Sequence, residues 1–376
     1  MNTTSSCNRY ISPHPGLILK GELEEYGISQ RELATALGKS APMINGILAG
    51  NKDITVEIAV LLESALPGSM TANEWLRLQN EHDIELKRSE SEVQDRTNAI
   101  EIWNCLRKNA NFNALRRRLD FGSDLQANMS LVMNTLGIRT LPELKKKLAS
   151  AGSGFKKSDK VQTDPANLFT WTVLVKHASQ AQELKTGFSI TNLPELKDRL
   201  NEVFLKNQMV VERTRELLNS YGIKFVTDEK RLDKVPVDGY SFWIGENPTI
   251  VATQRMNRID NFAFTIMHEI GHIERHLKRD AVEEFLDVDR TIMHIGKEED
   301  EANEYATDAL LQGITPETLF SGILNPYAAA RYLKAIAAKR KINVGIVTGQ
   351  YQFFCGQRGL VRNSYALCRE LIQKIG

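Results

Sequence analysis

The chain has 376 residues and a net charge of +1, and 42% of its residues are hydrophobic and 25% charged. At roughly 100–200 residues per domain, this length indicates two or three domains. The composition excludes wholesale disorder and collagen. Apolar runs such as Ile58–Leu62 are much shorter than the ~18–20 residues of a membrane-spanning helix, so we expect no membrane contact.

The N-terminal segment and the cysteines indicate the compartment. Residues 1–15 contain no basic segment followed by an apolar core, so we expect no secretory signal. The four cysteines are scattered and form no CxxC pair, which is typical of free thiols in a reducing environment. We therefore expect a cytoplasmic protein.

The small net charge hides an uneven distribution along the chain. Residues 1–90 contain 8 Lys and Arg against 12 Asp and Glu, whereas residues 101–200 contain 16 against 9. Such asymmetry indicates different roles for different segments. The basic middle segment could bind nucleic acid or an acidic partner, or it could be a solvated helical face.

Short helices are predicted near the N-terminus. Ser29 and Glu32 form a capping box at the start of one helix, which Gly38 ends. Ser40 can cap the next helix, and a further helix covers about residues 55–66. Two helices joined by a three- to four-residue turn are typical of a helix-turn-helix.

The pattern changes at about residue 205. Before it, residues 91–204 are predicted to be helical, with a weak internal repeat between residues 138–148 and 190–200. Beyond it, short strands and helices alternate. We therefore expect a mainly α fold with a small α+β part. The predicted segments are an N-terminal helix-turn-helix domain, a basic helical middle region and a C-terminal domain, over residues 1–90, 91–204 and 205–376.

The sequence His268-Glu269-Ile-Gly-His272 lies in the long helix predicted for residues 258–277. Histidines at i and i+4 are about 6 Å apart along a helix and share a face, so both can bind one zinc ion. The glutamate beside the first histidine can act as a general base. His276 lies about 12 Å along the axis from His268, too far for the same ion, and more naturally packs or forms hydrogen bonds.

A third ligand is expected on the next helix. Arg275 and Lys278 occupy the positions where a metzincin has Gly and His, which excludes that arrangement. Glu301 precedes an apolar stripe that would pack its helix beside the histidines, so we predict Glu301 as the third ligand. Glu298 and His294 are the alternatives. Asp308, two turns after Glu301, could orient a ligand histidine.

Residues 12–85 resemble the HigA branch of the Xre-type helix-turn-helix proteins, best known as antitoxins. The matching segments are His14-Pro15-Gly16, Ile28-Ser-Gln-Arg-Glu-Leu-Ala34, Ile44-Asn-Gly-Ile-Leu48, Asp53-Ile-Thr55 and Trp75-Leu-Arg-Leu-Gln79. The resemblance implies binding of double-stranded DNA, commonly as a homodimer.

The expected DNA contacts lie on the two helices of the motif. Asn45 or Ser40 would contact base edges, while Gln30 and Lys39 would hold phosphates. The helix that would enter the groove, residues 40–48, contains no Lys or Arg. This departs from the basic surface that DNA-binding domains usually carry.

Residues 205–350 resemble the ImmA/IrrE metallopeptidase family. The resemblance is carried by Phe264-Thr-Ile-Met-His-Glu-Ile-Gly-His272, Glu301-Ala-Asn-Glu-Tyr-Ala306 and Ile342-Asn-Val-Gly-Ile-Val-Thr-Gly349. It implies a gluzincin-like zinc site in which His268, His272 and Glu301 are ligands and Glu269 is the base. It also implies cleavage of Xre-type repressors.

Two functions are compatible with this sequence. The first is a zinc-dependent endopeptidase that cleaves a regulatory protein, either a repressor or a toxin partner, and that carries its own helix-turn-helix domain. Its substrate would lie extended beside an exposed strand at residues 249–252. The second is a DNA-binding antitoxin or repressor whose zinc-binding domain is a non-proteolytic sensor or binds protein.

Overall fold

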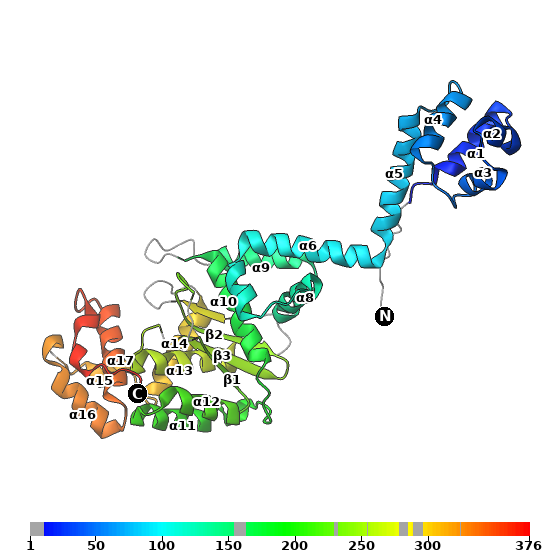
Figure 1. Ribbon diagram of the computed structural model, residues 1–376. Helices are drawn as coiled ribbons and strands as arrows, with labels where there is room; N and C mark the ends of the chain where they lie inside the picture. The colour runs from blue at the N-terminus through cyan, green and yellow to red at the C-terminus, as the bar shows by residue number, and fades with distance from the viewer. Residues whose placement is uncertain are drawn as a thin grey trace. The chain divides into compact units, whose positions relative to one another are not determined.

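The computed structural model describes residues 11–153, 163–228, 232–253, 255–277, 285–288, 296–323 and 325–376. The chain forms two compact units, Met1–Glu101 and Ile102–Gly376, and helix α6 (Ser91–Asn109) crosses the boundary between them (Figure 1). Residues 102–204 therefore belong to the same unit as the C-terminal part. The sequence instead predicted boundaries near residues 90 and 204.

The N-terminal unit is helical. Its remaining helices are α1 (Pro15–Tyr26), α2 (Gln30–Ala36), α3 (Ala41–Leu48), α4 (Val56–Ala65) and α5 (Ala72–Ser89). The predicted capping box is present, because the Ser29 side chain accepts from the Glu32 amide while the Glu32 carboxylate accepts from the Ser29 amide. Ser40 occupies the N-cap of α3 but makes no capping hydrogen bond there.

The His14-Pro15-Gly16 sequence fixes the start of α1 against α3. The Gly16 amide donates a 3.0 Å hydrogen bond to Nδ1 of His14, which caps the helix. A side chain at Gly16 would collide with the backbone carbonyl of Ile47. Trp75 of α5 is fully buried in the same core. Close packing among α1, α3 and α5 thus explains why the sequence has His14-Pro15-Gly16 and Trp75 at these positions.

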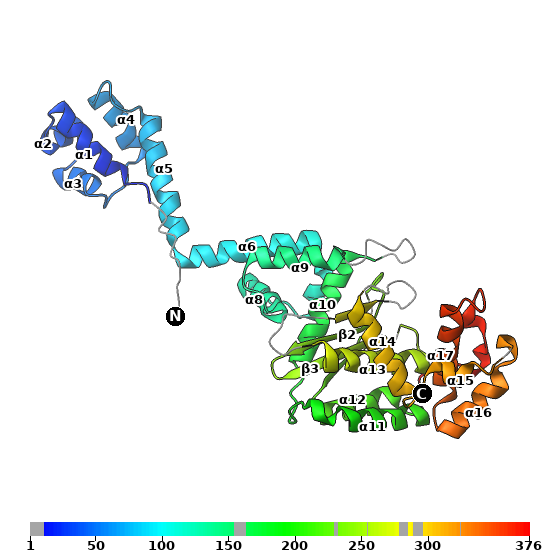
Figure 2. The same ribbon diagram turned by 180° about the vertical axis from the view of Figure 1, so that it is seen from behind.

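The C-terminal unit surrounds a small mixed sheet (Figure 2). The helices before the sheet are α7 (Phe112–Arg118), α8 (Leu125–Leu136), α9 (Leu141–Ser153), α10 (Pro165–Gln180), α11 (Leu193–Lys206) and α12 (Val210–Ser220). The later helices are α13 (Ile259–Arg275), α14 (Lys297–Leu310), α15 (Pro316–Phe320), α16 (Ala330–Arg340) and α17 (Val344–Gln357). Short 3-10 turns cover Ile190–Asn192, Pro326–Ala328, Ser364–Ala366 and Arg369–Leu371.

The strands are β1 (Lys224–Asp228), β2 (Val237–Ile244), β3 (Asn247–Thr253) and β4 (Phe285–Val288), in the spatial order β1-β3-β2-β4. β3 pairs in parallel with β1 and antiparallel with β2. The prediction that residues 249–252 form an exposed strand is therefore wrong, because both sides of β3 are already hydrogen-bonded. In the described part of the chain, β1 and β4 form the edges.

Alternation along the strands creates two apolar layers. Phe225, Ile250 and Ala252 face the core that contains α13, whereas Val226 and Val251 pack with α10. α13 is buried from Ile259 through Ile273 except Asp260 and Asn261, so it lies sandwiched between the sheet and its neighbours α14 and α17. Among the described residues, no helix has both the length and the apolar character needed to cross a bilayer.

Candidate functional site

The buried helix α13 brings two histidines and a glutamate to one place. His268 and His272 are one turn apart, and both are almost completely buried, as is Glu269 between them. His268 Nε2 lies 3.0 Å from His272 Nε2. The i, i+4 spacing therefore makes the two imidazoles converge, as expected for one face of a helix.

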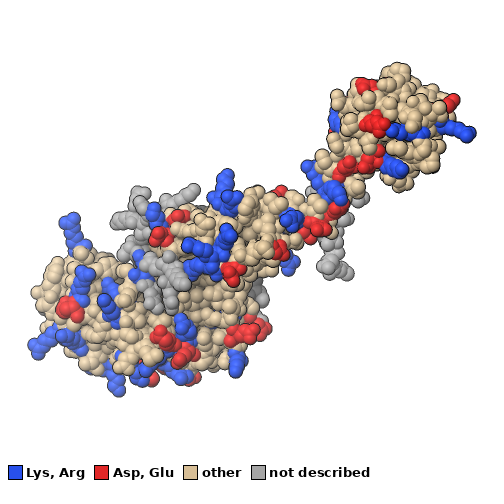
Figure 3. All heavy atoms as spheres, in the orientation of Figure 1, with Lys and Arg blue, Asp and Glu red and all other residues tan. Residues whose placement is uncertain are grey.

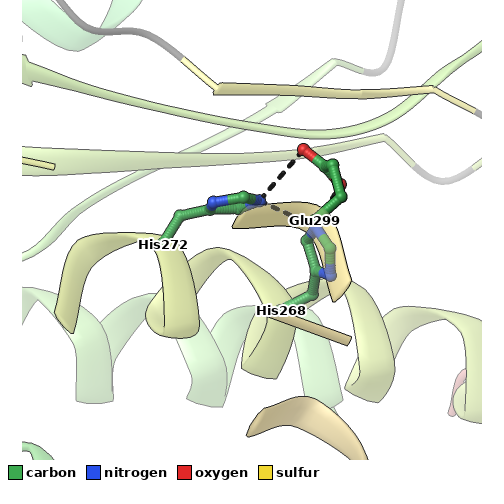
Figure 4. Close-up of side chains that lie close together, drawn as sticks. All are labelled: His268, His272 and Glu299. Atoms are coloured by element: carbon green, nitrogen blue, oxygen red, sulfur yellow. Dashed lines mark hydrogen bonds and ion pairs between the residues drawn. The ribbon is translucent and has the colours of Figure 1, made fainter. Parts of the chain in front are cut away.

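A carboxylate from α14 completes the cluster (Figure 4). Glu299 Oε2 lies 3.3 Å from His268 Nε2, and Glu299 Oε1 lies 3.4 Å from His272 Nε2. One ligand atom from each residue lies within 4.8 Å of the others. The three side chains thus point toward a common position between α13 and α14.

The structure corrects the predicted carboxylate, because Glu301 does not face these two histidines. The buried stripe of α14 contains Ala302 and Ala306, and Glu299 lies three and seven residues before them, on the same helical face. Glu301 is rotated by about 200° from Glu299 at 3.6 residues per turn. The stripe also contains Tyr305, four residues after Glu301, so the apolar pattern alone did not distinguish Glu299 from Glu301.

Glu301 instead supports the cluster through His276. Glu301 Oε2 lies 2.9 Å from His276 Nε2, and His276 Nδ1 lies 3.1 Å from His272 Nδ1. The Glu301 backbone carbonyl also accepts from Arg275. The prediction that His276 forms hydrogen bonds is thereby confirmed. Glu301 does not contact His272 itself but orients it through His276.

The contacts from Glu301 through His276 to His272 indicate which ring nitrogens carry protons. The hydrogen bond from His276, with help from Lys297, lowers the pKa of Glu301, so its carboxylate only accepts. When His276 donates from Nε2 to Glu301, its Nδ1 is the atom that can accept from Nδ1 of His272. His272 Nε2 is left with its lone pair directed at the cluster, as metal binding requires.

The ionisation of the cluster points in the same direction. Burial opposes the charge on Glu299, but its interactions with the imidazoles of His268 and His272 outweigh burial and hold the pKa of Glu299 well below its usual range. Burial lowers the pKa of His272, and this outweighs the opposing effect of Glu299. A neutral imidazole beside an ionised carboxylate is the state in which both bind a divalent metal.

The donor set and its spacing fit zinc. Zinc binds imidazole nitrogen and carboxylate oxygen at about 2.0–2.2 Å in a tetrahedron, which places neighbouring ligand atoms about 3.3 Å apart. The three separations here are 3.0, 3.3 and 3.4 Å. Three protein ligands leave the fourth position for water or substrate, which is the catalytic rather than the structural pattern.

Glu269 lies against strand β2 at a glycine. A Cβ added to Gly239 would overlap the Glu269 carboxylate and lie 2.8 Å from Cγ2 of Thr265. Gly239 pairs with Ala252 of β3 and with Asp287 of β4, next to an irregularity in the β2–β4 register. Nothing in the local sequence pattern links Gly239 to residue 269, so this contact could not be predicted from the sequence.

The remaining predicted residues of this site lie elsewhere. Asp308 lines a hollow of about 630 Å³ with Arg275, Glu304 and Gln350. Among the described residues, no hydrogen bond joins Asp308 to His268 or His272. Glu298 lies on an exposed part of α14, and His294 falls outside the described residues.

The predicted DNA contacts lie at the surface of the N-terminal unit. Gln30, Ser40 and Asn45 are exposed, the last on α3 opposite its buried Ile44 and Ile47. Lys39 is different, since its ammonium lies 2.6 Å from the Glu57 carboxylate of α4 and its side chain is only 20% exposed. The structure thus leaves three of the four residues open to a ligand and pairs the fourth.

Comparison with known proteins concerns this N-terminal part. Residues 19–72 match the helix-turn-helix family. Virulence-associated protein A' of Dichelobacter nodosus is 35% identical over 72 residues, which is 19% of this chain and 62% of that protein. Virulence-associated protein I of the same organism is 33% identical over 87 residues, which is 23% of this chain and 79% of that protein.

These similarities cover a minor share of the chain, and the chain spans less than two thirds of the first of the two relatives. The matched residues run from within α1 to the first residue of α5, and α2 and α3 among them form the helix-turn-helix. Such domains bind double-stranded DNA and are typical of transcriptional regulators. Through this N-terminal domain, of the Xre type, the chain belongs to the helix-turn-helix family.

Proposed function

We propose that the chain is a DNA-binding regulator that also has zinc-dependent endopeptidase activity. Its substrate would be a specific regulatory protein, either an Xre-type repressor or a toxin partner. The observation that carries the proposal is the convergence of His268, His272 and Glu299 beside the buried Glu269. The resemblance of residues 205–350 to the ImmA/IrrE metallopeptidases supports the same activity.

Each residue has a distinct role in this proposal. His268, His272 and Glu299 would hold the metal, while His276 and Glu301 keep the imidazole of His272 in the binding tautomer. When bound, zinc supplies Lewis acidity to the scissile carbonyl and acidifies water. Glu269 takes a proton from the attacking water and delivers it to the leaving amine nitrogen.

The sheet offers a place for the substrate backbone. β4 is an edge strand, and its partner β2 carries Gly239, over which the Glu269 carboxylate lies. An extended peptide could pair with the side of β4 that faces away from β2, where no other described strand pairs, and would then run past the base. We therefore assign peptide binding to β4 rather than to the internal strand β3.

A cleavage assay tests the proposal. The full chain, loaded with zinc, is incubated with candidate repressor and toxin proteins, and the products are identified by mass spectrometry. Glu269→Gln should abolish cleavage by removing the base while keeping the zinc content of wild type. Glu298→Gln, an exposed change on α14 that also removes one negative charge, is the matched control and should cleave normally.

A second candidate function is a DNA-binding regulator whose metal site senses zinc without proteolysis. The helix-turn-helix match supports its DNA-binding part. Two results together would favour this alternative: stoichiometric zinc binding, and no cleavage of any candidate by the zinc-loaded chain. Zinc-dependent change in affinity for DNA from the protein's own upstream region would then be its positive signature.

A further inference from the structure

We propose that the basic helices at the start of the C-terminal unit contact the phosphate backbone of duplex DNA. The cations lie on the last turn of α6, on α7, in the connection before α9 and near the start of α9, and we call the exposed surface of these segments the basic surface. It carries Arg107, Lys108, Arg116, Arg117, Arg139, Lys145 and Lys146. This inference rests on the proposed DNA binding, and it adds phosphate contacts to those that the acidic N-terminal unit can make.

The two units have opposite charge. Residues 1–101 contain 9 Lys and Arg against 15 Asp and Glu, whereas residues 102–153 alone contain 9 against 3. Neutralisation of phosphates by Lys and Arg supplies most of the affinity of proteins for DNA. An acidic DNA-reading domain therefore needs cations from another part of the chain.

The cations of the basic surface are available. All seven are exposed, and none has an ion-pair partner within 4.0 Å among the residues that the structure describes. Figure 3 shows Lys and Arg side chains gathered around the part of the C-terminal unit where α6 ends in Figure 1. By contrast, Lys39, Arg77 and Lys87 of the N-terminal unit pair with carboxylates.

Local helix chemistry explains only part of this charge. Arg107, Lys108, Arg116 and Arg117 lie in the last turns of α6 and α7, where cations are stabilised by the helix macrodipole. Lys145 and Lys146 lie near the start of α9, which begins at Leu141, so the macrodipole gives them no stabilisation. The two adjacent exposed lysines, Lys145 and Lys146, therefore point to an external anion.

Duplex DNA is the polyanion that the rest of the chain favours. The N-terminal domain belongs to a family of DNA readers, but its α3 presents Asn45 without a cation and its Lys39 is occupied by Glu57. Two DNA contacts on one chain reinforce each other, because the second becomes intramolecular once the first is made. In this arrangement α3 would contact the bases, and the basic surface would contact the phosphates.

Salt-dependent binding of the full chain to duplex DNA tests the inference. Two probes are used, a random-sequence duplex and a duplex from the protein's own upstream region. The variant Arg116→Gln/Arg117→Gln/Lys145→Gln/Lys146→Gln removes four cations. If each contacts one phosphate, the slope of log K against log salt should fall by about 3 to 4 on both probes, and affinity near 0.1 M salt by roughly a thousandfold.

A matched control removes the same charge elsewhere in the same unit. Arg331→Gln/Lys334→Gln/Lys339→Gln/Arg340→Gln alters exposed cations of α16 and should leave the slope within about one of wild type. The charge-preserving Lys145→Arg/Lys146→Arg should retain wild-type binding, which separates lost contacts from lost folding.

The outcomes are distinguishable. If wild type binds DNA and the four-fold variant has the same slope of log K against log salt as the α16 control, the basic surface does not contact DNA. DNA reading by α3 is then unaffected. Absence of any salt-sensitive binding by wild type rejects both this inference and the proposed DNA binding. Binding of an acidic protein by the basic surface, with no change in DNA affinity in the variants, assigns the surface to a protein partner instead.

Discussion

Two glutamates two residues apart on α14 have different roles in this structure. Glu299 faces His268 and His272 directly, whereas Glu301 reaches His272 only through His276. The sequence indicated that an acidic residue of this run would meet the histidines. It did not identify which one, because the rotation of α14 is fixed by the burial of Ala302, Ala306 and Ala309 against α13.

The two roles predict different losses of zinc affinity. Glu299→Ala removes a ligand atom and should weaken zinc binding more than 100-fold, whereas Glu301→Ala removes an orienting contact and should weaken it about 10- to 100-fold. Glu298→Ala is the control and should match wild type. Competition titration with a chelating dye measures all three. An equal loss in Glu299→Ala and Glu298→Ala would contradict the assignment of Glu299.

Gly239 provides a test of the base that leaves the metal ligands untouched. In Gly239→Ala the new methyl group would collide with the Glu269 carboxylate, so the carboxylate must move from its position over β2. We expect cleavage to fall at least tenfold while zinc content stays at the wild-type level. Gly122→Ala, at a glycine with open space around it, should cleave normally. Normal turnover by Gly239→Ala would show that this position of Glu269 is not needed.

At the scale of elements, local chemistry predicted more than long-range pairing did. The capping box of α2 and the extent of α13 follow from short-range spacing, and the structure contains both. The position of residues 249–252 inside the sheet did not follow from spacing. A strand becomes internal through its partners, and β1 lies more than twenty residues before β3 in the chain.

The ion pair between Lys39, at the turn between α2 and α3, and Glu57 of α4 predicts a change in DNA affinity. Glu57 holds the Lys39 ammonium, so Glu57→Gln should release Lys39 for a phosphate. The affinity for upstream DNA should rise, and the salt slope should steepen by about 0.9. Glu63→Gln removes the same charge from an exposed position of α4 and serves as the control. If both variants bind alike, the ion pair does not restrain Lys39.

The packing of α1 predicts a pH dependence of stability. Burial, and then the nearby His82, lower the pKa of His14, while Asp53 and Asp83 oppose this. A lowered folded-state pKa means that the unfolded chain takes up the proton first. The free energy of unfolding of the N-terminal unit should therefore fall as the pH drops through about 6.5. Thermal unfolding followed by circular dichroism measures this, and His14→Asn, which keeps a capping acceptor, should flatten the dependence. An unchanged profile in His14→Asn would assign the effect to other groups.

At the scale of the whole molecule, the chain combines a helix-turn-helix domain with a larger unit built around a buried His/Glu cluster. The sequence predicted both features from short motifs. The inclusion of residues 102–204 in the larger unit was not predicted, because it depends on Leu168, Trp171 and Val175 of α10 packing on the sheet. Those residues resemble any buried helical face until the strands are in place.

The central claim is that α13 and α14 together hold one zinc ion. X-ray absorption spectroscopy of the zinc-loaded full chain tests it most directly, with metal content measured on the same sample. The account predicts one zinc per chain, with two imidazole nitrogens and additional oxygen ligands at about 2.0–2.2 Å, and loss of that signal in His268→Ala. Failure to bind stoichiometric zinc, or a first coordination sphere with sulfur ligands at about 2.3 Å, would contradict it.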